Sequence, residues 1–233
     1  MEIVNGIEMH DLCLYVKEEK MLVLADVHLG YEEALNKQGI MIPRFQYQET
    51  IKRIKPILEK LEIEKIIVLG DLKHEFGTIS QTEWCDVLNF LELLEQYSNE
   101  IILIKGNHDR ILGPIADKKN VDLVEYYETK NIFFCHGDKL IATNKPITII
   151  GHEHPAIALE SNGRVETFKC FLKNENFLNK TLIVIPSYNL VTEGTNLLQE
   201  KLLSPYLQDS LDNYETWLVS DEVYHFGKVK NFK

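Results

Sequence analysis

Six short apolar runs, each ending abruptly at polar residues, constrain this sequence more than any other feature. They are rich in leucine and in β-branched residues, and the longest contains five residues. Continuous runs of this kind are typical of strands that are buried on both faces of a sheet. The runs occupy residues 21–25, 66–69, 101–104, 132–134, 147–150 and 182–185. The sequence therefore predicts a fold built around buried β-strands.

Helical segments are predicted between the early strands. Apolar residues recur at helical spacing from Ile51 to Leu61, although Pro56 interrupts the pattern locally. Ser80 and Glu83 have the spacing of a capping box at the start of another helix. Alternating strands and helices predict an α/β fold with a parallel sheet in the N-terminal half. After about residue 120 the strands follow one another directly, which predicts a more antiparallel part or a second sheet.

Length and composition set the limits of the interpretation. A chain of 233 residues without a linker or repeat is expected to form one domain over residues 1–233. The net charge of −11 disfavours extended binding to duplex DNA but leaves room for a local anion site. The four cysteines form no C-x-x-C pair, which favours free thiols in a reducing compartment. With no signal-peptide pattern and no bilayer-spanning stretch, a cytoplasmic protein without membrane contact is expected. Residues 196–212 predict a surface helix and turn, and residues 217–226 a late strand.

The residues after the first two apolar runs carry metal-binding chemistry. Asp26 and His28 follow the first run. Because residues two apart in extended backbone face the same side, their carboxylate and imidazole can reach one ion. Asp71 follows the second run, after a glycine that permits a sharp turn. Its two carboxylate oxygens can bridge two ions.

Three further motifs follow the later runs. In the GNHD motif the amide oxygen of Asn107 can ligate a metal, while His108 remains available for proton transfer. His136 opens the HGD motif, after the run IFFC. The GHEH motif places the imidazoles of His152 and His154 two residues apart, so one is suited to each ion.

This set of side chains suits a centre of two divalent metal ions. Two ions about 3.5–4 Å apart can hold a bridging hydroxide and clamp phosphate oxygens during in-line attack. Metal binding lowers the pKa of water from 15.7 to about 7. A histidine titrates in the range needed to protonate a leaving alkoxide. The sequence therefore indicates metal-dependent hydrolysis of a phosphate ester.

Each motif alone is weak evidence, because an Asp-x-His after a strand is more often a turn residue beside a surface histidine. Together they are strong evidence, since six of the eight histidines follow apolar runs. Lys73 and His74 follow Asp71 and either contact substrate phosphate or cap the next helix. Arg110 is a further candidate for phosphate contact, with solvated surface as the alternative.

The series DVHLG, GD, GNHD, HGD and GHEH resembles the calcineurin-like metallophosphoesterase superfamily over roughly residues 20–195. DVHLG at 26–30 is similar to the nuclease branch that contains the SbcD and Mre11 repair nucleases. The chain length, GDLKHEFG at 70–77 and GYEEALNKQGIMIP at 30–43 most closely resemble the small archaeal SbcD/Mre11-related phosphoesterases. The bacterial ligase-associated repair phosphoesterase is similar to that group.

The resemblance implies a four-layer α/β/β/α sandwich with mixed sheets, three ligands for each ion and one shared carboxylate. The implied ligands are Asp26, His28 and His154 for the first ion, Asn107, His136 and His152 for the second, and Asp71 as the bridge. His108 would be the general acid, steadied by Asp109. Mn²⁺ is the usual metal of the nuclease branch, and the oxygen and nitrogen ligands also suit Fe, Zn²⁺, Co²⁺ or Ni²⁺.

The sequence thus predicts a dinuclear metal-dependent phosphoesterase that cleaves phosphodiester bonds by attack of a metal-bridging hydroxide. Short or single-stranded DNA ends are the first interpretation of the substrate, because DVHLG resembles the nuclease branch. A phosphodiesterase or phosphomonoesterase for small nucleotides is the alternative, because the chain is acidic. Only roughly forty residues follow the last motif strand, too few for both the DNA-capping domain and the ATPase-docking segment of larger nucleases.

A non-catalytic module that keeps the metals is the rival from another class. The intact GNHD motif argues against it, since a pure binder would not require the proposed acid. Assembly into a homo-oligomer is left open by the sequence.

Overall fold

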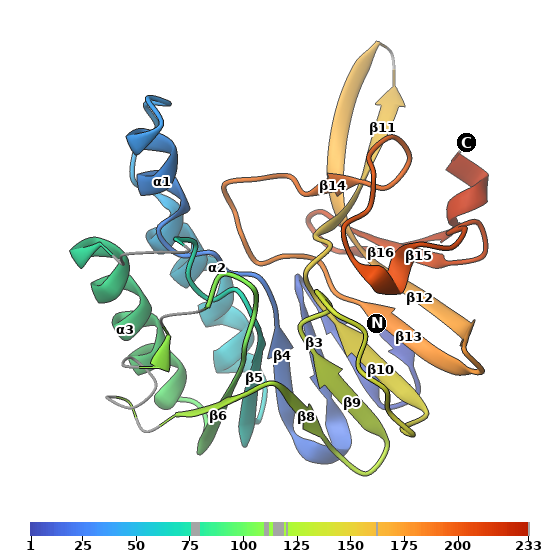
Figure 1. The fold of residues 1–233 in the computed structure, drawn as a ribbon, viewed down its shortest axis with the longest axis horizontal. Coiled ribbons are helices and arrows are strands. Elements are labelled where there is room, and N and C mark those ends of the chain that lie inside the picture. Colours follow the sequence, from blue (N-terminus) through green and yellow to red (C-terminus); the bar gives the residue numbers. More distant parts are fainter. Residues whose placement is uncertain (76–79, 110–111, 114–118, 120, 162, 233) are drawn as a thin grey trace.

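Two mixed β-sheets form the centre of the computed structural model, and the α-helices pack beside the first sheet (Figure 1). The structure describes residues 1–75, 80–109, 112–113, 119, 121–161 and 163–232. The α/β architecture with two mixed sheets confirms the predicted fold class. No helix in the described part of the chain is long and apolar enough to cross a membrane.

The first sheet has seven strands in the order β1-β2-β3-β4-β5-β6-β7. The strands are β1 (Glu2–Val4), β2 (Ile7–His10), β3 (Cys13–Val16), β4 (Met21–Leu24), β5 (Lys65–Leu69), β6 (Glu100–Ile104) and β7 (Asp122–Val124). Strands β4 to β7 are parallel, as the alternation of strands and helices predicts. Strands β1 to β4 form antiparallel pairs. Strands β1 to β3 precede the first apolar run and are not among the strands predicted from the sequence.

Three α-helices connect the parallel strands of the first sheet in the described residues: α1 (Tyr31–Lys37), α2 (Gln46–Lys60) and α3 (Gln81–Glu95). Helix α2 contains Pro56 and continues through it. Helix α3 begins as the capping pattern predicts, because the Ser80 hydroxyl accepts a hydrogen bond from the Glu83 N–H at 3.0 Å. The short 3₁₀ turn η1 (Lys17–Glu19) joins β3 to β4.

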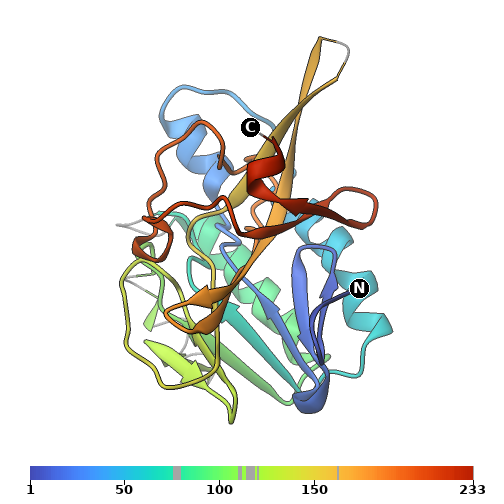
Figure 2. The same ribbon diagram turned by 90° about the vertical axis from the view of Figure 1, so that its right-hand side faces the viewer.

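The second sheet has nine strands, with the main order β14-β11-β12-β13-β10-β9-β8. These strands are β8 (Tyr126–Glu128), β9 (Ile132–Cys135), β10 (Ile147–Ile150), β11 (Pro155–Ser161), β12 (Arg164–Phe177), β13 (Lys180–Val184) and β14 (Thr195–Asn196), with β15 (Glu215–Val219) and β16 (Val223–Lys228) attached to β12. Its centre, β9-β10-β13, is parallel. The long hairpin of β11 and β12 extends away from the body of the molecule (Figures 1 and 2).

The central strands of the second sheet are buried on both faces, which explains their uninterrupted apolar sequence. Phe134, Ile149 and Ile183 pack in the core shared with the first sheet and its helices. Their chain neighbours Phe133 and Ile150 pack instead in a second core on the opposite face. Successive side chains of a strand point to opposite faces, so each strand contributes to both cores.

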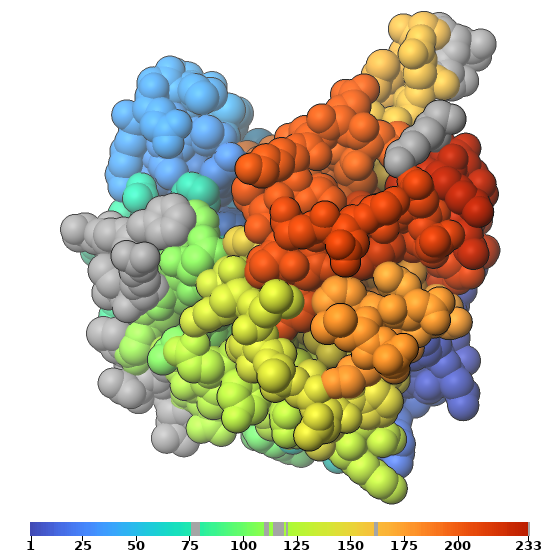
Figure 3. All heavy atoms as spheres, turned by 45° about the vertical axis from the view of Figure 1, so that its right-hand side comes forward, coloured from blue at the N-terminus to red at the C-terminus, as the bar shows by residue number. Residues whose placement is uncertain are grey.

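The surface helix predicted within residues 196–212 is wrong, because these residues form no α-helix. They contain the end of β14 and the 3₁₀ turn η2 (Pro205–Leu207), and most of their apolar side chains pack in the outer core of the second sheet. Figure 3 shows this segment, in orange, on the surface over that sheet. The outer layer here therefore consists of loops with η2 and η3 (Val229–Phe232). The late strand predicted at 217–226 is the hairpin of β15 and β16.

Candidate metal centre

The polar motifs meet because the carboxyl ends of their strands lie side by side. The N–H of Asp26, after β4, donates to the carbonyl of Gly70, after β5, at 3.1 Å. The N–H of Gly151, after β10, donates to the carbonyl of His136, after β9, at 2.9 Å. The two sheets are joined at the same place, since the His152 N–H donates to Oδ2 of Asp26 at 2.8 Å.

The seven predicted ligands lie in two adjacent groups. Asp26, His28 and His154 form the first group; Asp71, His136 and His152 form the second, each with ligand atoms within 4.8 Å of one another. Asn107 joins the second group, since its Oδ1 lies 3.1 Å from Nε2 of His136.

Asp71 belongs to the second group and also faces the first. Its Oδ2 is 3.7 Å from Nε2 of His28 in the first group and 3.4 Å from Nε2 of His136 in the second. Its other oxygen, Oδ1, accepts a hydrogen bond from the His108 N–H at 2.8 Å. One oxygen therefore fixes the GNHD turn, while the other faces the histidines of both groups.

Backbone strain is concentrated at this centre. Five of the seven residues adopt left-handed backbone conformations, which are uncommon outside glycine and cost of order 1–3 kcal/mol each. Their φ angles are 54° for Asp26, 49° for His28, 48° for Asp71, 67° for His152 and 53° for His154. The surrounding fold holds these residues in turns that aim their side chains at one another.

Glycines beside the ligands allow the motifs to approach. A Cβ on Gly70 would lie 2.4 Å from Nδ1 of His136, and one on Gly106 would lie 2.0 Å from Oδ1 of Asp71. A Cβ on Gly151 would lie 2.6 Å from Oδ2 of Asp26. The glycines of the GD, GNHD and GHEH motifs are therefore required by close packing against the ligands.

Gly70→Ala is expected to destabilise the protein and displace His136. Gly6→Ala is a matched control, because both glycines have a φ of +80° but a Cβ on Gly6 meets nothing within 4 Å. Both variants carry the left-handed strain of about 1–2 kcal/mol. Overpacking should lower the free energy of unfolding of Gly70→Ala by about 1–3 kcal/mol more. Urea unfolding of both variants measures this difference, and equal losses would contradict the packing argument.

The buried charges of the centre call for a cation. Burial by itself would raise the pKa of Asp71, but the bonded His136 imidazole and the nearby His28 hold that pKa well below its usual range. Burial by itself would lower the pKa of His136, yet Asp71 and Asp26 raise it. Without a metal ion, Asp71 and Asp26 thus favour the protonated form of the His136 imidazole. A metal ion would supply that positive charge instead.

The donor atoms also fit metal ions. Oδ1 of Asp26 is buried without a hydrogen-bond partner in the described residues, 3.5 Å from Nε2 of His154. Nε2 of His28 lies 3.3 Å from Nε2 of His154, so two imidazole nitrogens face each other. Burial, together with His154, lowers the pKa of His28, which favours the neutral form that ligates. Carboxylate, amide and imidazole donors of this kind suit divalent transition metals.

His108 lies at the edge of the two groups with one ring nitrogen fixed. Its Nδ1 bonds to the carbonyl of His74, and its Nε2 lies 4.0 Å from Oδ2 of Asp71. It lines a cavity of about 290 Å³ together with residues of both groups. An imidazole held in this way can present Nε2 to a bound ester.

The Asp109 carboxylate is buried and accepts a hydrogen bond from the Gly106 N–H at 3.0 Å. Burial, followed by repulsion from Asp71, raises the pKa of Asp109 to about 6. The hydrogen bond that Asp109 accepts from Gly106 therefore stabilises the backbone turn of the motif. That Asp109 also steadies His108 stays a prediction.

The three predicted substrate contacts lie in different surroundings. Lys73 is fully buried, and its ammonium bonds to the carbonyls of Glu75 and His108. Its backbone forms a β-bridge with Leu29, and its contact with substrate phosphate stays a prediction. His74 lines the cavity, with its ring 4.1 Å from that of Tyr31, and its contact with substrate stays a prediction. Arg110 lies outside the described residues.

Several buried polar residues near the centre have no counterpart in the sequence prediction. Glu153, the third residue of GHEH, accepts hydrogen bonds from the N–H groups of Leu203 and Ser204 at 2.9 and 2.7 Å. Glu32 and Gln46 lie beneath the DVHLG turn. The position of Glu153 inside the GHEH motif is a sequence signal for a structural role beside the ligands. Glu32 and Gln46 lie in ordinary helical sequence, which gives no signal of this kind.

Comparisons with known proteins agree with this geometry. The family described as Calcineurin-like phosphoesterase matches residues 19–210. No curated protein matches the chain. Among solved structures, nuclease MPE from Pseudomonas putida is similar with a TM-score of 0.67 and 21% identity, over 93% of this chain and 92% of that chain. Vacuolar Protein Sorting 29 from Cryptosporidium parvum gives a TM-score of 0.39 and 15% identity, over 86% of this chain and 84% of that chain.

The family match covers most of the chain and all five motifs, from Asp26 to His154. The similarity to nuclease MPE adds the fold as a whole, with both chains covered almost completely. The two groups of histidine and aspartate side chains are consistent with a dinuclear metal site. The chain therefore belongs to the calcineurin-like phosphoesterase family.

Proposed function

We propose that this protein is a dinuclear metal-dependent phosphodiesterase that cleaves short or single-stranded DNA ends. The observation that carries the proposal is the position of Asp71, whose Oδ2 lies within 4 Å of histidines in both ligand groups. A shared carboxylate between two sets of ligands is what a pair of adjacent cations requires.

The two ligand groups would each hold one ion. Asp26, His28 and His154 would hold the first ion, and Asn107, His136 and His152 the second, with Asp71 contacting both. We propose Mn²⁺ as the metal, with Fe, Zn²⁺, Co²⁺ or Ni²⁺ as alternatives that the same donors accept. When bound, two such ions lower the pKa of water and neutralise charge on the phosphate.

His108 would protonate the leaving oxygen. The bond between its Nδ1 and the carbonyl of His74 fixes the ring, and Nε2 is the nitrogen that would give the proton. The GNHD turn places this ring beside the second group, because the His108 N–H is bonded to Asp71. The acid is therefore positioned by the same carboxylate that would contact both ions.

The cavity is lined by groups that can donate hydrogen bonds to the oxygens of a phosphate ester. They include hydroxyl, amide and imidazole groups from Tyr31, Thr192, Asn189 and the ligand histidines. A phosphodiester, which carries one negative charge, is the proposed substrate class.

A nucleic-acid substrate is supported by nuclease MPE, which has the same fold, and by the DVHLG motif. The net charge of −11 favours a substrate of few phosphates over a long duplex. A small nucleotide diester is the second candidate, because it satisfies the same charge argument.

Hydrolysis of bis-p-nitrophenyl phosphate and of p-nitrophenyl phosphate in the presence of Mn²⁺ tests this proposal. The diester is expected to be cleaved with a kcat/KM at least about tenfold higher, and chelation of the metal should abolish cleavage of both. Preference for the monoester would contradict the proposed substrate class. A chain that cleaves neither ester, although it binds the metal, would support the non-catalytic module.

A further inference from the structure

The side chain of Gln46 lies buried beneath the turn that carries the first metal ligands. Its Nε2 donates hydrogen bonds to the carbonyl of His28 at 2.8 Å and to that of Val27 at 3.2 Å. Both partners are acceptors, so the amide nitrogen must face this turn. Gln46 thus binds the two peptide groups on either side of the His28 α-carbon.

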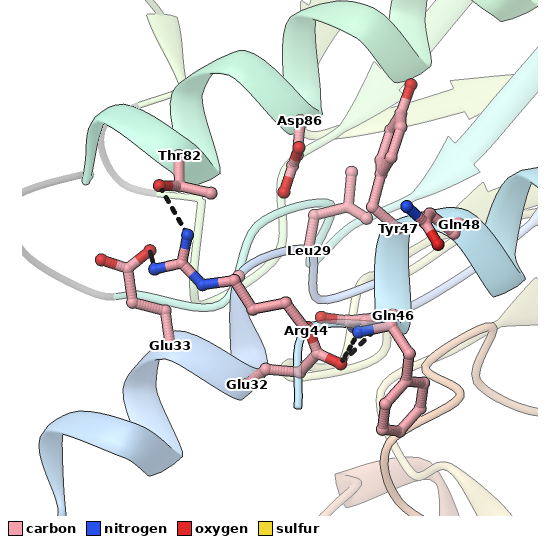
Figure 4. A pocket seen from close by; sticks show the side chains of 11 residues that line it. Leu29, Glu32, Glu33, Arg44, Gln46, Tyr47, Gln48, Thr82 and Asp86 are labelled. Atoms are coloured by element: carbon pink, nitrogen blue, oxygen red, sulfur yellow. Dashed lines mark hydrogen bonds and ion pairs between the residues drawn. The ribbon is translucent and has the colours of Figure 1, made fainter. Parts of the chain in front are cut away.

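Helix α2 holds Gln46 in place with help from Glu32 of α1. One carboxylate oxygen of Glu32 accepts hydrogen bonds from the N–H groups of Phe45 and Gln46, both at 2.7 Å (Figure 4). Phe45 offers no side-chain cap to α2, so Glu32 satisfies the first free N–H groups of that helix. A carboxylate at a helix N-terminus is also favoured by the helix dipole.

The same amide also contacts a loop that lines the cavity. Nε2 of Gln46 lies 3.3 Å from Oδ1 of Asn189, which also accepts a hydrogen bond from the Val191 N–H at 3.0 Å. Asn189 is buried and lines the cavity of the metal centre. Gln46 therefore links three parts of the chain that lie far apart in sequence.

We propose that Gln46 is a positioning residue for the first metal ion, because its carboxamide fixes the Val27–His28 turn that aims the His28 imidazole at Asp26 and His154. This inference rests on the proposed role of His28 as a ligand. His28 has a left-handed φ of 49° and an almost fully buried ring, with 3% of its surface exposed. A strained turn persists only where its surroundings hold it, and Gln46 supplies hydrogen bonds to both of its carbonyls.

Gln46→Met removes the two donors while keeping a side chain of similar length. Gln48→Met is the matched control, because Gln48 lies on the same helical turn and is exposed. His28→Ala identifies the binding step that belongs to the first ion. Calorimetric titration of the full, metal-stripped chains with Mn²⁺ alone should show this same step weakened about 10–100-fold in Gln46→Met. The other step should remain unchanged, and Gln48→Met should bind like the wild type.

The control measurements separate a positioning role from a general structural one. If Gln46→Met does not fold by circular dichroism, Gln46→Asn, which retracts the amide by one methylene, should weaken the same step. Two unchanged steps in a folded variant would overturn the inference while leaving the proposed function intact. Equal weakening of both steps would mark Gln46 as a general structural residue and would also overturn it. A wild-type chain that binds no Mn²⁺ would remove the proposed function as well.

Discussion

Asp71→Asn is expected to abolish hydrolysis and to weaken the binding of both metal ions. Oδ2 of Asp71 is the atom that faces histidines of both ligand groups, at 3.7 and 3.4 Å. Asparagine has the same shape, and its amide oxygen can still accept the hydrogen bond that the His108 N–H makes with Oδ1. The variant therefore removes the charge and one ligand atom while it preserves the GNHD turn.

The magnitude of this loss follows from the charge that the two ions stabilise. Metal ions contribute several kcal/mol of transition-state stabilisation, and each 1.36 kcal/mol is a factor of ten in rate. A decrease in kcat/KM of about a thousandfold or more is expected for bis-p-nitrophenyl phosphate. Metal analysis of the purified variant should also find fewer than two ions per chain.

Asp221→Asn is a suitable control for this experiment, because Asp221 is an exposed residue in the turn between β15 and β16. It should retain wild-type activity and metal content. An Asp71→Asn variant that keeps both ions and more than about a tenth of its activity would show that Asp71 is not the shared ligand. Asp26 would then be the candidate for the bridge, because its Oδ1 lies 3.5 Å from Nε2 of His154 and 3.6 Å from Nδ1 of His136.

The chemistry of this centre could be predicted from the sequence because each ligand directly follows a buried strand. Residues that end neighbouring parallel strands meet at one edge of the sheet, so the spacing of Asp26, Asp71 and Asn107 along the chain does not matter. The apolar runs identify those strands, since burial on both faces excludes polar residues from them. For the same reason the second sheet could be anticipated from the runs after residue 120.

Other features depend on contacts that no local pattern encodes. Lys73 has the sequence position of a phosphate-binding residue, yet its side chain is fully buried and bonds to the carbonyls of Glu75 and His108. Residues 196–212 carry apolar side chains that suit a helix, yet most of them pack on the second sheet from loops and from η2. Gln46 is indistinguishable in sequence from the exposed Gln48, and its role is visible only where α2 meets the DVHLG turn.

His108→Ala is expected to separate proton transfer from metal binding. Both proposed ions keep the ligands assigned to them in this variant, although His108 also lies with His28 and His74 in a third group of possible metal ligands. The side chain removed is the one whose Nδ1 bonds to the carbonyl of His74 and whose Nε2 lies 4.0 Å from Asp71. Metal content close to that of the wild type is therefore expected, together with a selective loss of catalysis.

The loss should depend on the leaving group of the substrate. General acid catalysis contributes about 10²–10⁴-fold when the leaving oxygen is a poor one, as in the alkoxide of a dinucleotide. The p-nitrophenolate of bis-p-nitrophenyl phosphate leaves readily without a proton, so its cleavage by His108→Ala should fall far less. Comparison of kcat for both substrates, with the exposed His225→Ala as control, measures the difference. If both substrates lose activity equally, or if the variant loses its metal ions, His108 acts as a ligand or a structural residue and the acid must be sought elsewhere. His74 would be the next candidate, because its ring lies 5.1 Å from that of His108 and lines the same cavity.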